Sequence, residues 1–263
     1  MIATVAPAKL PAQSDGLALD LATALDPALV LRRMGFVPDQ WQEDLLRSTA
    51  QRILMNIHRQ AGKSTVIGAL AAHTAVYQPD SLVLVLSPGL RQSQELFRKC
   101  LDAYHALGGA APADAETALR LELVNGSRII SLPGKEETVR GYSGVRLLLV
   151  DEAARVPNEL YMSVRPMLAV SGGRLIAPST PFGKRGWWYE AWSSDQVWER
   201  VEIPATRCPR IAPEFLAEER AALGMWYPQE YECQFIQAEG SVFMYEDIRA
   251  MLSADVQPIV FGQ

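Results

Sequence analysis

Ile53-Leu54-Met55-Asn56-Ile57-His58-Arg59-Gln60-Ala61-Gly62-Lys63-Ser64-Thr65 is the stretch that decides the fold of this 263-residue chain. Its apolar first part, Ile53 to Ile57, is typical of a short buried strand, and a helix-compatible segment, Ser64 to Val76, follows the polar loop. A strand, a loop ending in Gly-Lys-Ser and a helix together predict a phosphate-binding loop. Its backbone N–H groups and the helix N-terminus face an anion. Ile57 departs from the usual pattern, which has glycine at that position.

The loop residues have distinct expected roles. Lys63 adds a point charge for the β- and γ-phosphates, and the hydroxyl of Ser64 is placed to ligate Mg²⁺. A Gly-Lys-Ser tripeptide alone would fit an ordinary helix N-terminus, but the strand before it favours the phosphate loop. The predicted nucleotide contacts here are Arg59, Gln60, Ala61, Gly62, Lys63, Ser64 and Thr65.

Composition excludes some classes of protein. Hydrophobic residues at 49% and charged residues at 21% are ordinary globular values. A net charge of −5 argues against a protein coated in positive charge to hold nucleic acid, although a local basic channel remains compatible with it. The three cysteines are widely spaced, which favours buried free thiols over a disulfide or zinc site. The N-terminus fits neither a signal peptide nor a membrane span.

Further apolar runs alternate with helical segments, which predicts an α/β fold with a mainly parallel sheet flanked by helices. Asn125-Gly126 predicts a hairpin turn, and residues 108–115 are expected to form a loop. We expect an N-terminal arm with short helices over 1–35 and a core that contains the phosphate loop over 36–205. Helical segments at 213–223 and 228–237 then suggest a small C-terminal lid subdomain, which with the start of a linker covers 206–263. The expected strands after the first are 82–86, 121–124, 128–132, 145–150, 174–178 and 198–203.

A second decisive element is the apolar strand that ends in Asp151-Glu152. Ligands gather outside the carboxyl ends of parallel strands, so both carboxylates would face the phosphates. Asp151 would hold Mg²⁺, directly or through water, and Glu152 would orient and deprotonate the attacking water. An Asp-Glu pair alone would more simply be a solvated helix cap, but the upstream phosphate loop favours the catalytic interpretation.

The nucleotide is expected to be ATP. A small GTPase would carry a guanine-reading Asn-Lys-x-Asp sequence, which the chain lacks, and a kinase would lack the Asp-Glu pair. Gln42 would lie near the base, since a glutamine amide can pair with both edge groups of adenine. The alternative for the segment around Gln42 is a packed amphipathic helix without contact to the nucleotide.

With these motifs in order, the chain resembles the large terminase subunits of tailed phages, over roughly residues 36–245. The resemblance implies a P-loop NTPase of the RecA/ASCE type. In that family the phosphate loop carries an arginine and lacks the first glycine, so Ile57 agrees with the family. The motifs that carry the resemblance are Trp41-Gln42, Arg59 to Ser64, Val139-Arg140-Gly141, Leu148 to Glu152, Ser179-Thr180-Pro181 with Gly183, and Gln229 to Phe235.

The resemblance also implies roles for three further residues. Arg59 and Arg140 are candidates for the arginine that completes the site, with Arg140 acting across a subunit boundary. The alternative for Arg140 is a salt bridge to Glu136 or Glu137. Thr180 resembles the coupling motif that links hydrolysis to movement, and its alternative is a strand-end turn set by Pro181.

As implied by the resemblance, the chain is an ATPase motor domain that moves double-stranded DNA into a procapsid. The expected partners are the DNA, the portal protein and procapsid, the small terminase subunit and further copies in a ring, in the host cell cytoplasm. Nuclease activity is not expected, because the chain stops where a nuclease domain would begin. The main alternative is a helicase-like core, but such helicases carry a second RecA-like domain, and no second core fits after residue 200. A third possibility is a nucleotide-binding module without catalysis, and Glu152 argues against it.

Overall fold

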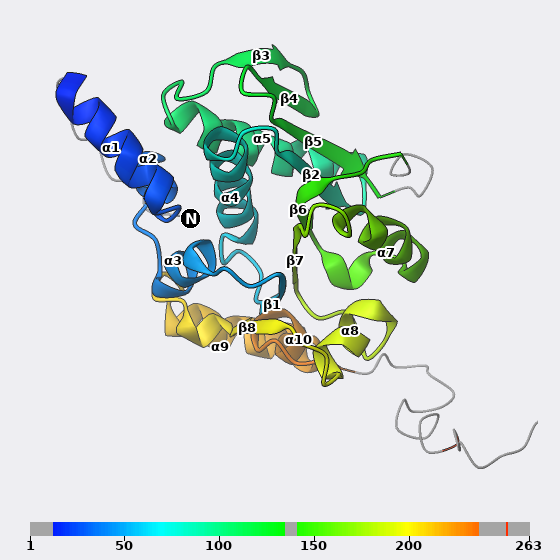
Figure 1. Ribbon diagram of the computed structural model, residues 1–263. Coiled ribbons are helices and arrows are strands. Elements are labelled where there is room, and N and C mark those ends of the chain that lie inside the picture. The colour runs from blue at the N-terminus through cyan, green and yellow to red at the C-terminus, as the bar shows by residue number, and fades with distance from the viewer. Residues whose placement is uncertain (1–12, 135–140, 237–250, 252–263) are drawn as a thin grey trace, which may run out of the picture.

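The computed structural model describes residues 13–134, 141–236 and 251. One eight-stranded sheet organises this part of the chain (Figure 1). The strand order is β3 (Ala113–Glu116), β4 (Arg120–Leu123), β5 (Arg128–Pro133), β2 (Leu82–Ser87), β6 (Val145–Val150), β7 (Arg174–Ser179), β1 (Arg52–Ile57) and β8 (Glu199–Ile203).

From β5 to β8 every neighbouring pair of strands is parallel. Parallel strands are covered on both faces, which explains their continuous apolar sequences; β2 is buried at all six positions. At the other edge, β3, β4 and β5 pair antiparallel. The expected Asn125-Gly126 turn joins β4 to β5, and Gly126 adopts the positive φ of 82° that this turn requires.

Helices cover both faces of the sheet (Figure 1). Alternate residues of β1 point to opposite faces: Ile53 and Met55 join the core beneath one helical layer, and Leu54 joins the core beneath the other. The first layer consists of α2 (Leu29–Arg33), α3 (Gln40–Arg47), α4 (Lys63–Tyr77) and α5 (Leu90–Ala106); the second contains α7 (Asn158–Val164) and α8 (Gly186–Ser193).

The helix α4 follows the phosphate loop and is apolar on almost all sides. Such a helix must be enclosed by neighbours, and α4 packs against the sheet and, along its side, against α5. Gly68 allows this close approach, because a Cβ atom there would lie 2.9 Å from the backbone carbon of Lys99 on α5. Outside this layer, α1 (Gln13–Leu25) is tied to α4 by a 2.5 Å hydrogen bond from the Tyr77 hydroxyl to Asp20.

The last described segment contains α9 (Pro213–Leu223) and α10 (Tyr227–Tyr231), which lie beside β8 and β1 (Figure 1). The amide of Asn56 on β1 donates a 2.7 Å hydrogen bond to the carbonyl of Cys233, which fixes the chain after α10 to the strand next to the edge strand β8. No residue of α9 itself is buried. The lid boundary proposed for this region stays a prediction.

The α/β fold with a mainly parallel sheet is confirmed, and the three cysteines are free and buried as expected. Two elements were not predicted, namely β3 within the expected loop 108–115 and helix α7. The helix expected over 228–237 is shorter, because α10 ends at Tyr231. Within the described residues, no helix combines the length and apolar character needed to cross a bilayer.

Candidate active site

The strand order brings three of the predicted site segments to the carboxyl-terminal ends of neighbouring strands. The strand β7 pairs with β1 on one side and with β6 on the other. The phosphate loop follows β1, Asp151 follows β6 and Thr180 follows β7, so all three segments leave the carboxyl ends of adjacent parallel strands. The strand before Thr180 thus lies directly beside the strand that ends in Asp151-Glu152.

The phosphate loop surrounds an open cavity of about 320 Å³. Gln60 and Gly62 have positive φ values of 60° and 90°, which turn the backbone sharply before α4 begins. Every loop residue predicted to contact nucleotide lines this cavity, and one residue from another strand, Glu152, joins them; the lining is Arg59, Gln60, Ala61, Gly62, Lys63, Ser64, Thr65 and Glu152.

Lys63 is buried beneath the loop. Its ammonium donates hydrogen bonds to the carbonyls of Ile57 at 3.1 Å and His58 at 3.3 Å. Burial lowers the pKa of Lys63, and the nearby carboxylates of Glu152 and Asp151 oppose that shift. These two carbonyl contacts hold the positive charge at the base of the loop, where a bound phosphate would be.

Asp151 is buried at the end of β6, and its Oδ1 atom has no hydrogen-bond partner among the described residues. Burial raises the pKa of Asp151 to about 6, with a further contribution from the charge of Glu152. A buried carboxylate oxygen without a partner fits a magnesium ligand, as does the hydroxyl of Ser64 on the loop. The described residues hold no cluster of three or more His, Cys, Asp or Glu that could bind a metal alone, so phosphate oxygens and water would complete the shell.

Glu152 is held in place by Arg155, which the sequence analysis missed. Arg155 Nη1 lies 2.6 Å from Glu152 Oε2 and donates a 3.2 Å hydrogen bond to Thr180 Oγ1. Glu152 itself adopts a left-handed backbone conformation with φ of 47°. One guanidinium therefore links the expected catalytic carboxylate on β6 to the expected coupling hydroxyl after β7.

Arg59 points towards α10. Its Nε atom lies 2.7 Å from Glu230 Oε2, and its backbone N–H donates to the Glu230 carbonyl at 3.3 Å. Arg59 also lines a second cavity, of about 280 Å³, together with residues of α9 and α10. The arginine of the phosphate loop is thus paired with a carboxylate of the C-terminal segment.

Gln42 lies against the phosphate loop, and both the nitrogen and the oxygen of its side-chain amide are hydrogen-bonded. Its Nε2 atom donates to the Ala61 carbonyl at 3.3 Å, and its Oε1 atom accepts the backbone N–H of Asp39 at 2.9 Å. It also borders a small cavity beside Phe36 and Thr65. Contact with a base therefore stays a prediction, and Arg140 lies outside the described residues.

Residues 54–250 match the family described as terminase large subunit, T4likevirus-type, N-terminal. Two curated relatives are similar over 83% of this chain and 53% of their own length: the terminase large subunits of Thermus virus P23-45, 25% identical, and of Thermus phage G20c, 24% identical. The chain therefore spans about half the length of the curated relatives that it matches.

Solved structures share the fold. The large terminase ATPase domain of Thermus phage P74-26 has a TM-score of 0.69 at 22% identity, covering 78% of this chain and 97% of that one. The large terminase of a thermophilic bacteriophage, solved in complex with ADP, has a TM-score of 0.59 at 13% identity, covering 79% of this chain and 53% of that one. The chain thus belongs to the family of N-terminal domains of T4likevirus-type terminase large subunits.

Proposed function

We propose that this chain hydrolyses ATP and that, within a longer terminase subunit, hydrolysis drives double-stranded DNA into a procapsid. The observation that supports the proposal most is the position of Glu152. This carboxylate comes from a different strand, yet it lines the same cavity as the whole phosphate loop. A site that only bound nucleotide would not need a second carboxylate opposite the phosphates.

The loop residues would bind and orient the triphosphate. The backbone N–H groups from Gln60 to Ser64 and the ammonium of Lys63 would face the phosphate oxygens. Ser64 and Asp151 would hold Mg²⁺, which neutralises charge on the β- and γ-phosphates. Gln42, beside Ala61, would lie on the base side of the loop.

Glu152 would orient the attacking water and accept its proton. Arg155 fixes the direction of this carboxylate, so the water would be aligned before the reaction begins. Arg59 and Arg140 are the proposed sources of the charge that stabilises the departing γ-phosphate. Thr180, hydrogen-bonded to Arg155, would couple the state of the nucleotide site to movement of the DNA.

The partners follow from family membership and remain part of the proposal. They are double-stranded DNA, the portal protein with its procapsid, the small terminase subunit and further copies of the chain in a ring, acting in the host cell cytoplasm. The division into 1–35, 36–205 and 206–263 is proposed on the same basis. The nuclease reaction is not assigned to this chain.

The test is phosphate release from ATP, measured with nucleotide binding on the same samples. Glu152→Gln keeps the shape of the side chain but cannot accept a proton, so turnover should fall by about 10²–10⁴-fold while ATP remains bound. Lys63→Ala should instead lose both, since it removes a charge-assisted contact to phosphate.

Equal loss of nucleotide affinity in the two variants would overturn the assigned roles. Absence of ATP turnover by the wild type, with and without double-stranded DNA, would overturn the proposed activity.

A further inference from the structure

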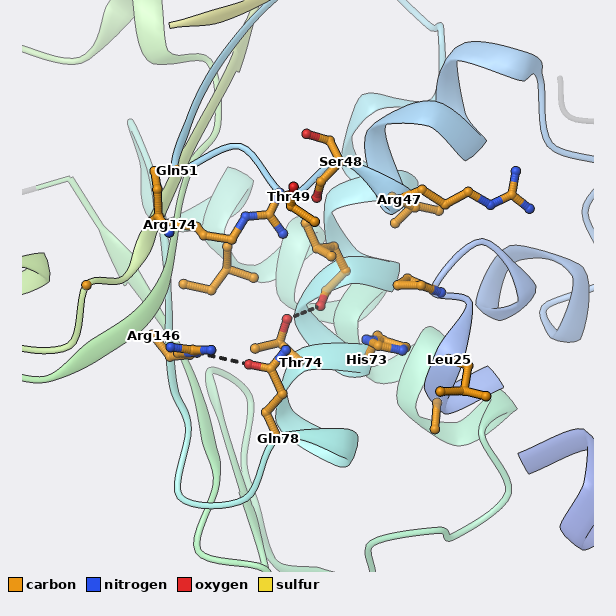
Figure 2. A pocket seen from close by; sticks show the side chains of 16 residues that line it. Leu25, Arg47, Ser48, Thr49, Gln51, His73, Thr74, Gln78, Arg146 and Arg174 are labelled. Atoms are coloured by element: carbon orange, nitrogen blue, oxygen red, sulfur yellow. Dashed lines mark hydrogen bonds between the residues drawn. The ribbon is translucent and has the colours of Figure 1, made fainter. Parts of the chain in front are cut away.

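Another cavity, of about 450 Å³, lies at the amino-terminal ends of the strands, on the opposite side of the sheet from the phosphate loop. Figure 2 shows this cavity between the amino ends of the strands and the second half of α4. Gln51 precedes β1, Arg146 lies near the start of β6, and Arg174 begins β7. Among the described residues, three arginines line the cavity and no aspartate or glutamate does, although the whole chain carries a net charge of −5.

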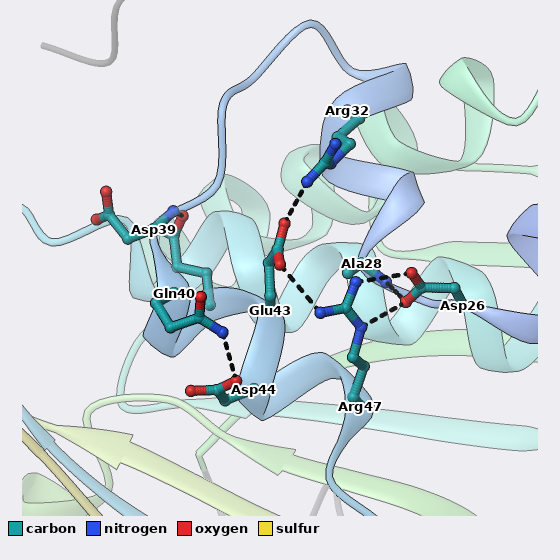
Figure 3. A network of polar contacts seen from close by, with 9 residues as sticks. Asp26, Ala28, Arg32, Asp39, Gln40, Glu43, Asp44 and Arg47 are labelled. Atoms are coloured by element: carbon teal, nitrogen blue, oxygen red, sulfur yellow. Dashed lines mark hydrogen bonds and ion pairs between the residues drawn. The ribbon is translucent and has the colours of Figure 1, made fainter.

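One of the three arginines is already neutralised. Figure 3 shows Arg47 between two carboxylates: Nη2 lies 2.8 Å from Asp26 Oδ2, and Nη1 lies 3.0 Å from Glu43 Oε2. The guanidinium of Arg47 points away from the cavity in Figure 2. Arg47 therefore fastens α3 to the segment before α2 and offers no charge to a ligand.

Arg174 is positioned rigidly at the cavity wall. Its Nε donates to the carbonyl of Ala50 at 3.0 Å, and its Nη2 donates to the carbonyl of Ser48 at 2.8 Å. Neutral carbonyls fix the guanidinium without cancelling its charge. Nη1 makes no hydrogen bond to any described residue.

Arg146 presents a second uncompensated charge. Its Nε donates to Gln78 Oε1 at 3.0 Å, and its side chain forms no ion pair with a described carboxylate. Burial lowers the pKa of Arg174, the negative charge of Glu199 opposes this shift, and the positive charge of Arg146 adds a smaller decrease. Glu199 makes no ion pair with Arg174 and accepts the Ser48 hydroxyl at 2.7 Å.

We propose that this cavity is a second anion site, which binds a phosphate group between Arg146 and Arg174. One guanidinium group can occupy both oxygens of a carboxylate. A phosphate has more oxygens, so it can accept hydrogen bonds from both guanidinium groups at once. The phosphate is either free or part of a DNA backbone. The proposal does not depend on ATP hydrolysis, because the cavity shares no residue with the phosphate loop.

The experiment follows the Nε–H signals of Arg146 and Arg174 by nuclear magnetic resonance while inorganic phosphate is added. ADP and Mg²⁺ are kept saturating, so that the phosphate loop is filled. Both signals should move together to a plateau, whereas chloride at equal ionic strength should not move them.

Arg146→Gln should shift the midpoint for the Arg174 signal to about tenfold higher phosphate, since a hydrogen bond between charged groups is lost. The matched control is Arg120→Gln, which removes an arginine from β4 at the far edge of the sheet and should leave the midpoint unchanged. The proposal is wrong if phosphate leaves the Arg174 signal in place, or if the midpoint is the same in Arg146→Gln as in the wild type.

A short double-stranded DNA then identifies the source of the phosphate. If the DNA moves the same two signals and binds several-fold more weakly to Arg146→Gln than to Arg120→Gln, the group is a backbone phosphate. If inorganic phosphate moves the signals and DNA does not, the site serves free phosphate. Arg174→Lys keeps the positive charge but loses the planar set of guanidinium donors. It should weaken the binding of either ligand while preserving the fold.

Discussion

Arg155 is the residue whose position changes the interpretation of the site most. The sequence separates Glu152 from Thr180 by the whole of α7 and β7, and one guanidinium joins them in space. The same guanidinium lies 4.8 Å from the ring centre of Phe182. Arg155 contacts the carboxylate that we propose acts in catalysis, so we assign it the role of a positioning residue.

Replacing Arg155 by alanine should lower turnover more than nucleotide affinity. Glu152 would lose the contact that fixes its direction, and displacement of a catalytic group by about 1 Å can reduce a rate about 100-fold. We expect a fall in kcat of about 10- to 100-fold with ATP binding nearly unchanged. Steady-state turnover and equilibrium nucleotide binding separate the two effects.

Arg185→Ala is the matched control. Arg185 lies over the same Phe182 ring, at 4.9 Å, but within the described part of the chain it forms no hydrogen bond with Glu152 or Thr180. Loss of the aromatic contact alone would affect both variants equally. Equal kcat values for the two variants would show that Arg155 does not position Glu152.

We expect His58, directly after β1, to make folding sensitive to acid. Burial lowers the pKa of His58 to about 4; the charges of Lys63 and Arg210 act in the same direction, and a backbone contact at Arg59 and the charge of Asp39 oppose them. The unfolded chain, with a histidine pKa of about 6.5, binds more protons between these values. Stability contributed by neutral His58 is therefore complete above pH 6.5 and is lost as the pH falls towards 4.

In His58→Leu, the free energy of unfolding should fall less steeply with decreasing pH between about 6.5 and 4. Urea titrations at several pH values would measure the slopes. Burial also lowers the pKa of His73, so the relevant quantity is the difference in slope between the wild type and His58→Leu. Parallel slopes would mean that His58 is protonated equally easily in the folded and unfolded chains.

At the level of elements, the parallel strands were predictable because burial on both faces leaves continuous apolar sequences. The strand β3 was not, since all four of its residues, Ala113 to Glu116, are exposed and only its pairing with β4 defines it. The helix α7 was missed because it is short and its apolar face is sparse, with only Leu160 and Val164 buried.

In the site, too, only the features that have a local sequence pattern were predictable. The phosphate loop and Asp151-Glu152 were predictable because each is a local sequence at a strand end. The contact of Arg155 with Thr180 depends on β7 lying beside β6, and that of Arg59 with Glu230 depends on how α10 packs. Neither contact leaves a spacing in the sequence that would identify it.

Gly68→Ala should destabilise the packing of α4 against α5. The added methyl group would lie 2.9 Å from the Lys99 backbone, so the two helices must separate, and overpacking of this kind costs about 1–3 kcal/mol. The free energy of unfolding in urea measures the loss. Gly16→Ala in α1 is the control, because its methyl group meets nothing within 4 Å and alanine favours a helix; similar stability changes in both variants would contradict the steric argument.

For the whole molecule, the sheet separates two charged regions. The phosphate loop, Asp151 and Glu152 lie at the carboxyl-terminal ends of the strands. Arg146 and Arg174 lie at the amino-terminal ends. The strands β6 and β7 run from one region to the other. Arg59 meanwhile lines the phosphate-loop cavity, and its Nε atom is paired with Glu230 of α10.

This pairing sharpens the choice between Arg59 and Arg140 as the arginine that completes the site. We predict that Arg140 acts on the phosphate loop of a neighbouring subunit, so hydrolysis depends on assembly. Arg140→Ala and Lys63→Ala should each be inactive alone. When mixed at concentrations where subunits associate, some interfaces pair an intact loop with an intact Arg140, and phosphate release should partly return.

Arg59→Ala mixed with Lys63→Ala is the matched control for this complementation. Arg59 and Lys63 belong to the same loop, so no subunit in that mixture has both, and mixing cannot restore a site that needs Arg59 within its own subunit. Activity should therefore return in the first mixture only. If sedimentation shows that the subunits associate and the Arg140→Ala mixture still stays inactive, Arg140 does not act across the boundary. Arg59 would then be the better candidate for the arginine that stabilises the departing phosphate.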